Sequence, residues 1–176
     1  VLYCDSLSSK KRKDCTMVLN IVLESLLKWF APILVFTTDE IYNLVSDKDE
    51  SVHEHLFVDI PKNWENNELN DKWEKLFKIK QEANIAIEEK RSNKEIGSSL
   101  EAEITITTNS INSELFKNLD LAEYFITSKA NQIDSEDQKD LKISVRKTTG
   151  NKCPRCWKVL EKKCIRCEKA ILDKAG

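Results

Sequence analysis

The sequence contains few of the residues that interrupt helices and strands, and few histidines. It has three glycines, three prolines and two histidines among 176 residues. So few glycines and prolines exclude a collagen-like chain and a long flexible linker. No apolar run reaches the roughly 18 residues that a membrane span requires, and the first residues lack the order of a signal peptide. We therefore expect no membrane partner and a cytoplasmic location. Because the chain begins at Val1 and not at methionine, we also expect a segment of a longer protein.

The sequence also lacks a recognisable catalytic motif. It contains no glycine-rich phosphate loop, and its two histidines, His53 and His55, stand two residues apart in a polar stretch. That spacing is a weak signal for a metal site, and we assign the pair to surface chemistry. The neighbouring carboxylates of Asp39 and Glu40 are explained by helix capping. We predict no catalytic residue in this chain.

The sequence does contain a strong separation of charge. From Lys142 to the end there are eleven basic and three acidic residues, which leaves this stretch at +8 and the preceding part at −10. A basic tail on an acidic body indicates a polyanionic partner, most often a nucleic acid. A solvated charged tail is the alternative, and charge alone does not decide between them.

Apolar periodicity predicts helices in the first part of the chain. Hydrophobic residues recur at helical spacing over residues 6–30, with serines available as N-caps and an end set by Pro32. A second helix is expected over 37–45, where "TTDE" reads as a capping box of Thr37 and Glu40. Two helices joined by a short turn suggest the end of a helical bundle.

The following part predicts a small α+β unit. Residues 46–70 are rich in turn residues, with "LFVDI" as a short extended piece between them. A third helix is expected over 70–91. "EAEITITT" and "LKISVRK" alternate polar and apolar residues as half-buried strands do, and "SELFKNLDLAEYF" between them reads as one or two short helices.

The end of the chain carries a cysteine module. Two C-x2-C pairs, Cys153 with Cys156 and Cys164 with Cys167, are separated by seven residues. This pattern is typical of a tetrahedral, structural zinc site that binds one ion. Disulfides are disfavoured in a cytosolic chain, and a redox motif would need one pair beside a βαβ unit. Iron remains possible with the same ligands. We interpret Cys4 and Cys15 as ordinary thiols.

Basic and aromatic residues surround the four cysteines. The side chains of Lys152, Arg155, Lys163 and Arg166 can offset the thiolate charge, contact phosphate, or do both. Trp157 can pack over the metal loops or stack on an unpaired base, and the sequence favours neither role. The "KKRK" run at 10–13 is interpreted as a solvated or RNA-facing surface.

Several motifs in a fixed order resemble one family. "LYCD" at 2–5, "KWFAPILVFTTDEIY" at 28–42, "SVH" at 51–53, "IGSSLEAEITI" at 96–106 and "KCPRCW" at 152–157 together resemble the C-terminal part of bacterial isoleucyl-tRNA synthetases. The chain departs from the family in a shorter gap between the cysteine pairs and in Tyr42, which stands where tryptophan is common. The signature motifs for ATP and the editing domain of that family are missing from the chain.

The resemblance implies an α+β fold in three parts. Residues 1–62 would end the anticodon-binding helical domain, 63–148 would form a small α+β junction domain, and 149–176 would form a zinc-binding module. The parent would be a monomeric, ATP-dependent isoleucine–tRNA ligase, and this chain would bind the anticodon stem and loop of isoleucine tRNA without a catalytic site. The expected RNA contacts are Arg155, Trp157, Lys158, Lys152, Arg166, Lys11 and Arg12.

Two other classes of function are compatible with the cysteine module. One is a terminal finger of the kind found in DNA glycosylases of the formamidopyrimidine type, although the N-terminal catalytic proline and the helix–two-turn–helix of those enzymes are not found. The other is a zinc-stapled interaction domain without an RNA role.

Overall fold

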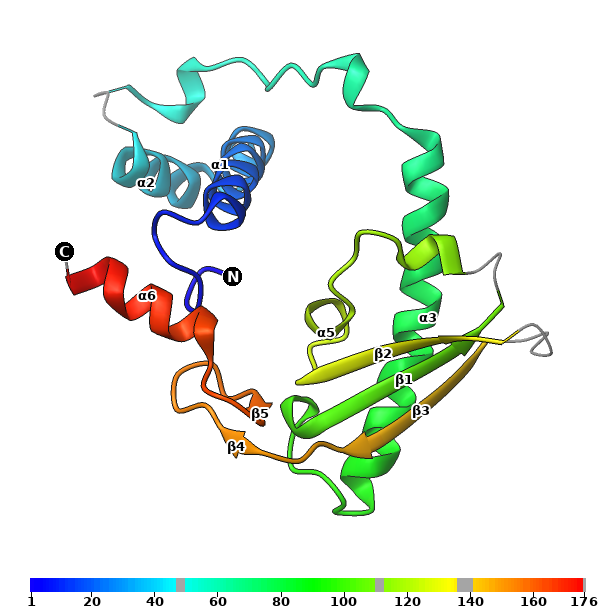
Figure 1. The fold of residues 1–176 in the computed structure, drawn as a ribbon. Coiled ribbons are helices and arrows are strands. Elements are labelled where there is room, and N and C mark those ends of the chain that lie inside the picture. Colours follow the sequence, from blue (N-terminus) through cyan, green and yellow to red (C-terminus); the bar gives the residue numbers. More distant parts are fainter. Residues whose placement is uncertain (47–49, 110–112, 136–140, 176) are drawn as a thin grey trace. The chain divides into compact units, whose positions relative to one another are not determined.

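The computed structural model describes residues 1–46, 50–109, 113–135 and 141–175, and its elements are labelled in Figure 1. The chain divides into two compact units, Val1–Glu65 with Arg166–Gly176, and Asn66–Ile165. Helices and small sheets occur together, so the predicted α+β class is confirmed. Among the described helices, none combines the length and the apolar character that a membrane span requires.

The first unit is built on two helices, α1 (Lys10–Phe30) and α2 (Val35–Val45). The side chain of Ser9 accepts a hydrogen bond from the Arg12 N–H and caps α1. The helix ends at Phe30, as predicted, but Ala31 before Pro32 keeps helical backbone angles (φ −51°, ψ −44°), so the expected exclusion of helical angles before proline does not set this end. A small core forms where α1 packs against α2 and the following turn. Its buried members are Leu27, Ala31 and Val52, with Leu23, Ile41 and Tyr42 packed against them.

The capping box predicted for α2 is wrong. The helix begins at Val35, two residues earlier than expected, and no side chain caps its first turn. The Thr38 hydroxyl donates to the carbonyl of Leu34 at 2.9 Å, which is the back-bonding of a threonine already inside a helix. The backbone N–H groups of Ile33 and Leu34 both bond the Phe30 carbonyl, so the chain turns at once and α2 starts directly after α1.

The segment between the helices and the second unit is largely irregular, as predicted, and residues 47–49 lie outside the described residues. It contains two single-turn 3-10 helices, η1 (Val52–Glu54) and η2 (Lys62–Trp64). The piece "LFVDI" forms neither helix nor strand.

The first unit also contains a helix that the sequence patterns had not suggested, α6 (Ile165–Ala175). It is held by the N-terminal segment. Arg166 donates to the Asp5 carboxylate. Asp173 accepts hydrogen bonds from the hydroxyls of Ser6 and Ser8.

The second unit places one long helix against a three-stranded sheet. Helix α3 (Asn67–Ser92) matches the predicted third helix and is capped by the Asn66 side chain. Strands β1 (Ala102–Thr108) and β3 (Lys142–Lys147) confirm the two predicted strands. The short helices predicted between them are η4 (Glu114–Phe116) and α5 (Leu121–Tyr124), and η3 (Ser99–Glu101) precedes β1.

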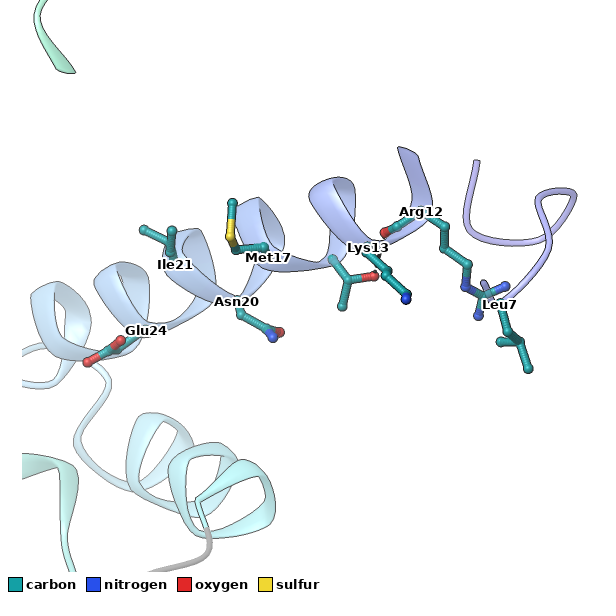
Figure 2. A pocket seen from close by; sticks show the side chains of 8 residues that line it. Leu7, Arg12, Lys13, Met17, Asn20, Ile21 and Glu24 are labelled. Carbon is teal, nitrogen blue, oxygen red and sulfur yellow. Dashed lines mark hydrogen bonds between the residues drawn. The ribbon is translucent and has the colours of Figure 1, made fainter. Parts of the chain in front are cut away.

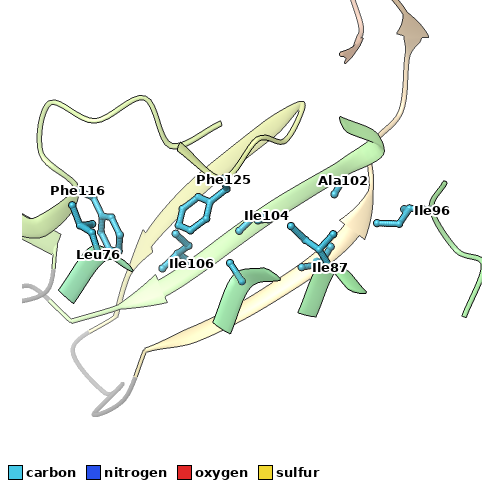
Figure 3. Packing of buried hydrophobic residues seen from close by; sticks show 10 residues of the cluster. Leu76, Ile87, Ile96, Ala102, Ile104, Ile106, Phe116 and Phe125 are labelled. Carbon is cyan, nitrogen blue, oxygen red and sulfur yellow. The ribbon is translucent and has the colours of Figure 1, made fainter. Parts of the chain in front are cut away.

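Strand β2 (Lys129–Asp134) was not predicted. The strand order is β2-β1-β3, with β1 parallel to β2 and antiparallel to β3. The central strand β1 therefore satisfies its backbone on both sides. Ile104 and Ile106 of β1 point into the core, where they meet Leu76 and Ile87 of α3 and the rings of Phe116 and Phe125 (Figure 3). A short hairpin, β4 (Asn151–Lys152) with β5 (Val159–Leu160), follows the sheet.

Candidate metal centre and its surroundings

The four cysteines of the two C-x2-C pairs form one cluster. The Sγ atoms of Cys153, Cys156, Cys164 and Cys167 all lie within 4.8 Å of one another, and those of Cys156 and Cys164 are 3.7 Å apart. A tetrahedron of sulfurs about 2.3 Å from a central zinc has edges of about 3.8 Å. A disulfide, by contrast, joins its sulfurs at about 2.05 Å, and none forms among the six cysteines, all of which are described. The cluster could hold a metal ion.

The first cysteine pair is shaped by the turn between β4 and β5. The backbone N–H of Cys153 donates to the Lys158 carbonyl at 2.8 Å, and that of Trp157 donates to the Cys153 carbonyl at 2.9 Å. Trp157 takes a left-handed backbone conformation with φ 65°, which a non-glycine residue adopts only where its surroundings enforce it. These bonds close the loop and bring both sulfurs to the same side.

The second cysteine pair lies at the start of α6. Cys164 directly precedes the helix and Cys167 lies in its first turn. Cys167 is 4% exposed, while the other three cysteines are half-buried. Four cysteines around one point leave no open position, so such a centre can stabilise the fold but cannot bind a substrate.

The predicted RNA contacts beside the cysteines differ in exposure. The Trp157 side chain is 59% exposed, and Lys152 places its Nζ 6.0 Å from the ring centroid. Arg155 and Lys158 are half-buried. An exposed ring next to a cation favours base stacking over packing on the metal loops, and the stacking role stays a prediction.

The other predicted contacts lie in the first unit. Arg166 is engaged with Asp5, and its hydrogen bond and positive charge lower the pKa of that carboxyl. Arg12 donates to the carbonyls of Leu2 at 2.7 Å and Asp5 at 3.3 Å, which ties the N-terminal segment to α1. Lys11 is exposed on the first turn of the same helix.

A shallow groove of about 500 Å³ follows one side of α1 (Figure 2). Arg12 and Lys13 lie at one end of it and Glu24 at the other, with Met17 and Ile21 between them. Arg12 and Lys13 of the "KKRK" run form its basic end.

Asp39 and His55, which precede the metal module in the sequence, make hydrogen bonds within the first unit. The Asp39 carboxylate accepts hydrogen bonds from the Ser51 hydroxyl at 2.6 Å and the Val52 N–H at 3.1 Å, and these bonds lower its pKa. Asp39 thus caps η1 and not α2. The ring of His55 hydrogen-bonds the Tyr42 hydroxyl at 2.8 Å, so the tyrosine that departs from the family pattern has a local partner.

Comparison with known proteins adds a family to this geometry. Residues 1–106 match the model of the anticodon-binding domain of tRNA ligases. The chain is 48% identical over 165 residues to the isoleucine–tRNA ligase of Pelagibacter ubique. The matched region covers 94% of the chain and 18% of that ligase. It is 37% identical over 172 residues to the isoleucine–tRNA ligase of Caldanaerobacter subterraneus, and this match covers 89% of the chain and 18% of that ligase. It is 35% identical over 167 residues to the isoleucine–tRNA ligase of Bartonella henselae, and this match covers 89% of the chain and 17% of that ligase. The chain spans about a fifth of the length of these relatives, and the matches confirm the resemblance that the motifs predicted.

Proposed function

Because the chain belongs to the anticodon-binding domain family of tRNA ligases, we propose that it binds the anticodon stem and loop of isoleucine tRNA as part of an isoleucine–tRNA ligase. The observation that carries this proposal is the similarity to isoleucine–tRNA ligases along nearly the whole chain. The ATP-dependent joining of isoleucine to its tRNA would be performed by other parts of a monomeric, cytoplasmic parent. The division into 1–62, 63–148 and 149–176 is part of the same proposal.

The proposed metal is a single structural zinc ion held by the thiolates of Cys153, Cys156, Cys164 and Cys167. The support is the chemistry of the donors: four soft sulfurs with a tetrahedral edge length suit a d10 ion that prefers sulfur. Iron suits the same donors, so metal analysis must identify the ion. Zinc would supply folding energy to a module that has little core of its own, on the order of 10 kcal/mol.

The proposed RNA surface is centred on Trp157. An aromatic side chain that stacks on a base contributes about 1–3 kcal/mol, and lysines and arginines beside it contact phosphates. Arg155, Lys158, Lys152 and Arg166 would supply those charges next to the metal, and Lys11 with Arg12 would supply them on the helical pair.

Binding of isoleucine tRNA, measured by fluorescence anisotropy over a range of salt concentrations, tests the proposal. We expect affinity to fall steeply with salt, because each phosphate contact releases counterions. Trp157→Ala should weaken binding by about 1–3 kcal/mol without loss of metal. Trp64→Ala is the matched control, because Trp64 has a similar exposure of 56% but lies in η2, outside the metal module.

Three results would argue against this assignment. Undetectable tRNA binding at low salt would remove the RNA role and leave a metal-stapled interaction domain. Unchanged binding in Trp157→Ala, together with loss of metal, would give Trp157 a packing role. Tighter binding to duplex DNA than to tRNA would favour the finger of the DNA-glycosylase type.

A further inference from the structure

Ser128, directly before β2, connects three segments of the second unit. Its side chain is buried, with the residue 7% exposed. Its backbone N–H donates to the carbonyl of Ala102 at 3.2 Å. Its hydroxyl donates to the carbonyl of Leu100 at 2.5 Å and accepts a hydrogen bond from the N–H of Val159 at 2.6 Å. One serine therefore bonds η3, β1 and the hairpin strand β5.

The Val159 N–H lies on the outer edge of the β4–β5 hairpin. Lys152 pairs with Val159. The next pair toward the turn is Cys153 with Lys158, where the Cys153 N–H donates to the Lys158 carbonyl. In an antiparallel ladder, successive residues turn their backbone groups alternately inward and outward. Lys158 is bonded inward, so Val159 directs its N–H out of the hairpin. The Ser128 oxygen satisfies this edge donor.

The hairpin strands are too short to hold their position by their own pairing. Each of its strands is two residues long, and an isolated two-stranded hairpin is marginally stable at best. It is joined to β3 through the linker at Thr148, whose N–H donates to the Glu101 carbonyl at 2.8 Å. The bond from Ser128 to Val159 attaches the other strand of the hairpin, β5, to the start of β2.

The turn of this hairpin carries Cys153 and Cys156. We propose that Ser128 is a positioning residue for the metal centre: it orients the first cysteine pair on the α+β unit and couples metal binding to order at the sheet edge. This rests on the proposed metal function. Because coupling between two sites is reciprocal, the Ser128 bond should raise metal affinity, and the metal should in turn protect that bond.

The experiment compares metal affinity and amide exchange in four full-length chains. Zinc affinity is measured by competition with a chromophoric chelator in the wild type, Ser128→Ala, Ser128→Thr and Ser144→Ala. Ser128→Thr keeps the hydroxyl. Ser144→Ala is the matched control, because Ser144 is an exposed serine on β3 whose hydroxyl makes a long hydrogen bond, 3.4 Å, to the Thr105 carbonyl. Exchange at the Ile106 amide reports whether the core stays folded.

We expect Ser128→Ala to lose about tenfold in zinc affinity, the lower end of the range for partners that orient metal ligands. Exchange at Val159 should accelerate by about the same factor, with Ile106 unchanged. Ser128→Thr and Ser144→Ala should stay within about twofold of the wild type. Equal affinity in Ser128→Ala, or equal loss in Ser128→Thr with the core intact, would overturn the proposal.

A second measurement covers the case in which Ser128→Ala unfolds the unit. In the wild type, removal of zinc should accelerate exchange at Val159 and Ser128 together and leave Ile106 protected. If the Val159 amide exchanges equally fast with and without zinc, Ser128 does not couple to the metal. If the wild type binds no metal, the metal function itself fails, and that result is distinct from either of these.

Discussion

Replacement of Gly150 by alanine should disrupt the metal module while leaving the α+β core folded. Gly150 has φ +131°, a backbone conformation that costs a residue with a side chain about 1–3 kcal/mol. An added Cβ would also lie 2.4 Å from the carbonyl oxygen and 2.5 Å from the carbonyl carbon of Leu160. These are backbone atoms of β5, so no side-chain rotation can relieve the overlap.

The clash can be relieved only if β5 moves away from β4. That movement breaks the pairing of Asn151 with Leu160, and each hydrogen bond lost costs about 0.5–1.5 kcal/mol. With one ladder bond counted, the two effects together amount to about 1.5–4.5 kcal/mol. Because the hairpin carries Cys153 and Cys156, and folding of such a module is coupled to metal binding, the cost should appear in metal affinity. We expect a loss of roughly 10- to 1,600-fold.

Chelator competition measures the affinity, and a thermal melt followed by far-UV circular dichroism measures the core. Gly97→Ala is the matched control: its Cβ would meet only the flexible side chain of Glu101, at 3.3 Å, so its metal affinity should be unchanged. If Gly150→Ala bound metal within about twofold of the wild type, the link from the backbone of Gly150 to the cysteine turn would be refuted.

Three further predictions concern the second unit. Arg146 donates to Glu103 at 2.8 Å and, as the largest cause, holds the pKa of this buried carboxyl below its ordinary value of 4.5. Glu103 therefore stabilises the fold fully above pH 4.5 and loses that contribution as pH falls through its lower folded-state pKa. Urea titrations should accordingly show Glu103→Gln destabilised at pH 7 and converging on the wild type in acid; a constant gap would contradict this. Leu76→Ala removes a side chain with 0% exposure and should cost about 2–5 kcal/mol in the same titration. Asn66→Ala removes the cap that accepts the Leu69 N–H at 2.9 Å and should cost about 1 kcal/mol, seen as lower helicity and a lower melting temperature.

Local patterns predicted the elements that repeat apolar residues at a regular spacing. Strands β1 and β3 alternate apolar and polar residues, and α3 repeats its apolar residues at helical spacing, so both were visible in the sequence. Strand β2 reads "KANQID" and has no such alternation. It forms because β1 offers it a parallel edge, and no pattern within its own six residues signals that partner.

The candidate site shows the same division. The ligand spacing in the two C-x2-C pairs fixed the metal cluster, since two intervening residues bring two sulfurs to one point. The contact between Ser128 and Val159 could not be predicted from the sequence, because neither residue belongs to a motif and the two meet only after the sheet has formed. The residues from Thr37 to Glu40 match the sequence pattern of a capping box, but α2 begins earlier, at Val35, because the chain turns tightly at the end of α1.

The first unit is built from two segments that are far apart in the sequence, and this has a consequence for its synthesis on the ribosome. Val1–Glu65 and Arg166–Gly176 belong together, and all of Asn66–Ile165 is translated between them. Asp5 and its partner Arg166 are 161 residues apart, so at about 5–20 residues per second roughly 8 to 32 seconds separate their synthesis. The α+β unit is complete before then and can fold first, while the N-terminal segment waits for α6. Translation order thus makes the last helix the step that completes the first part of the chain.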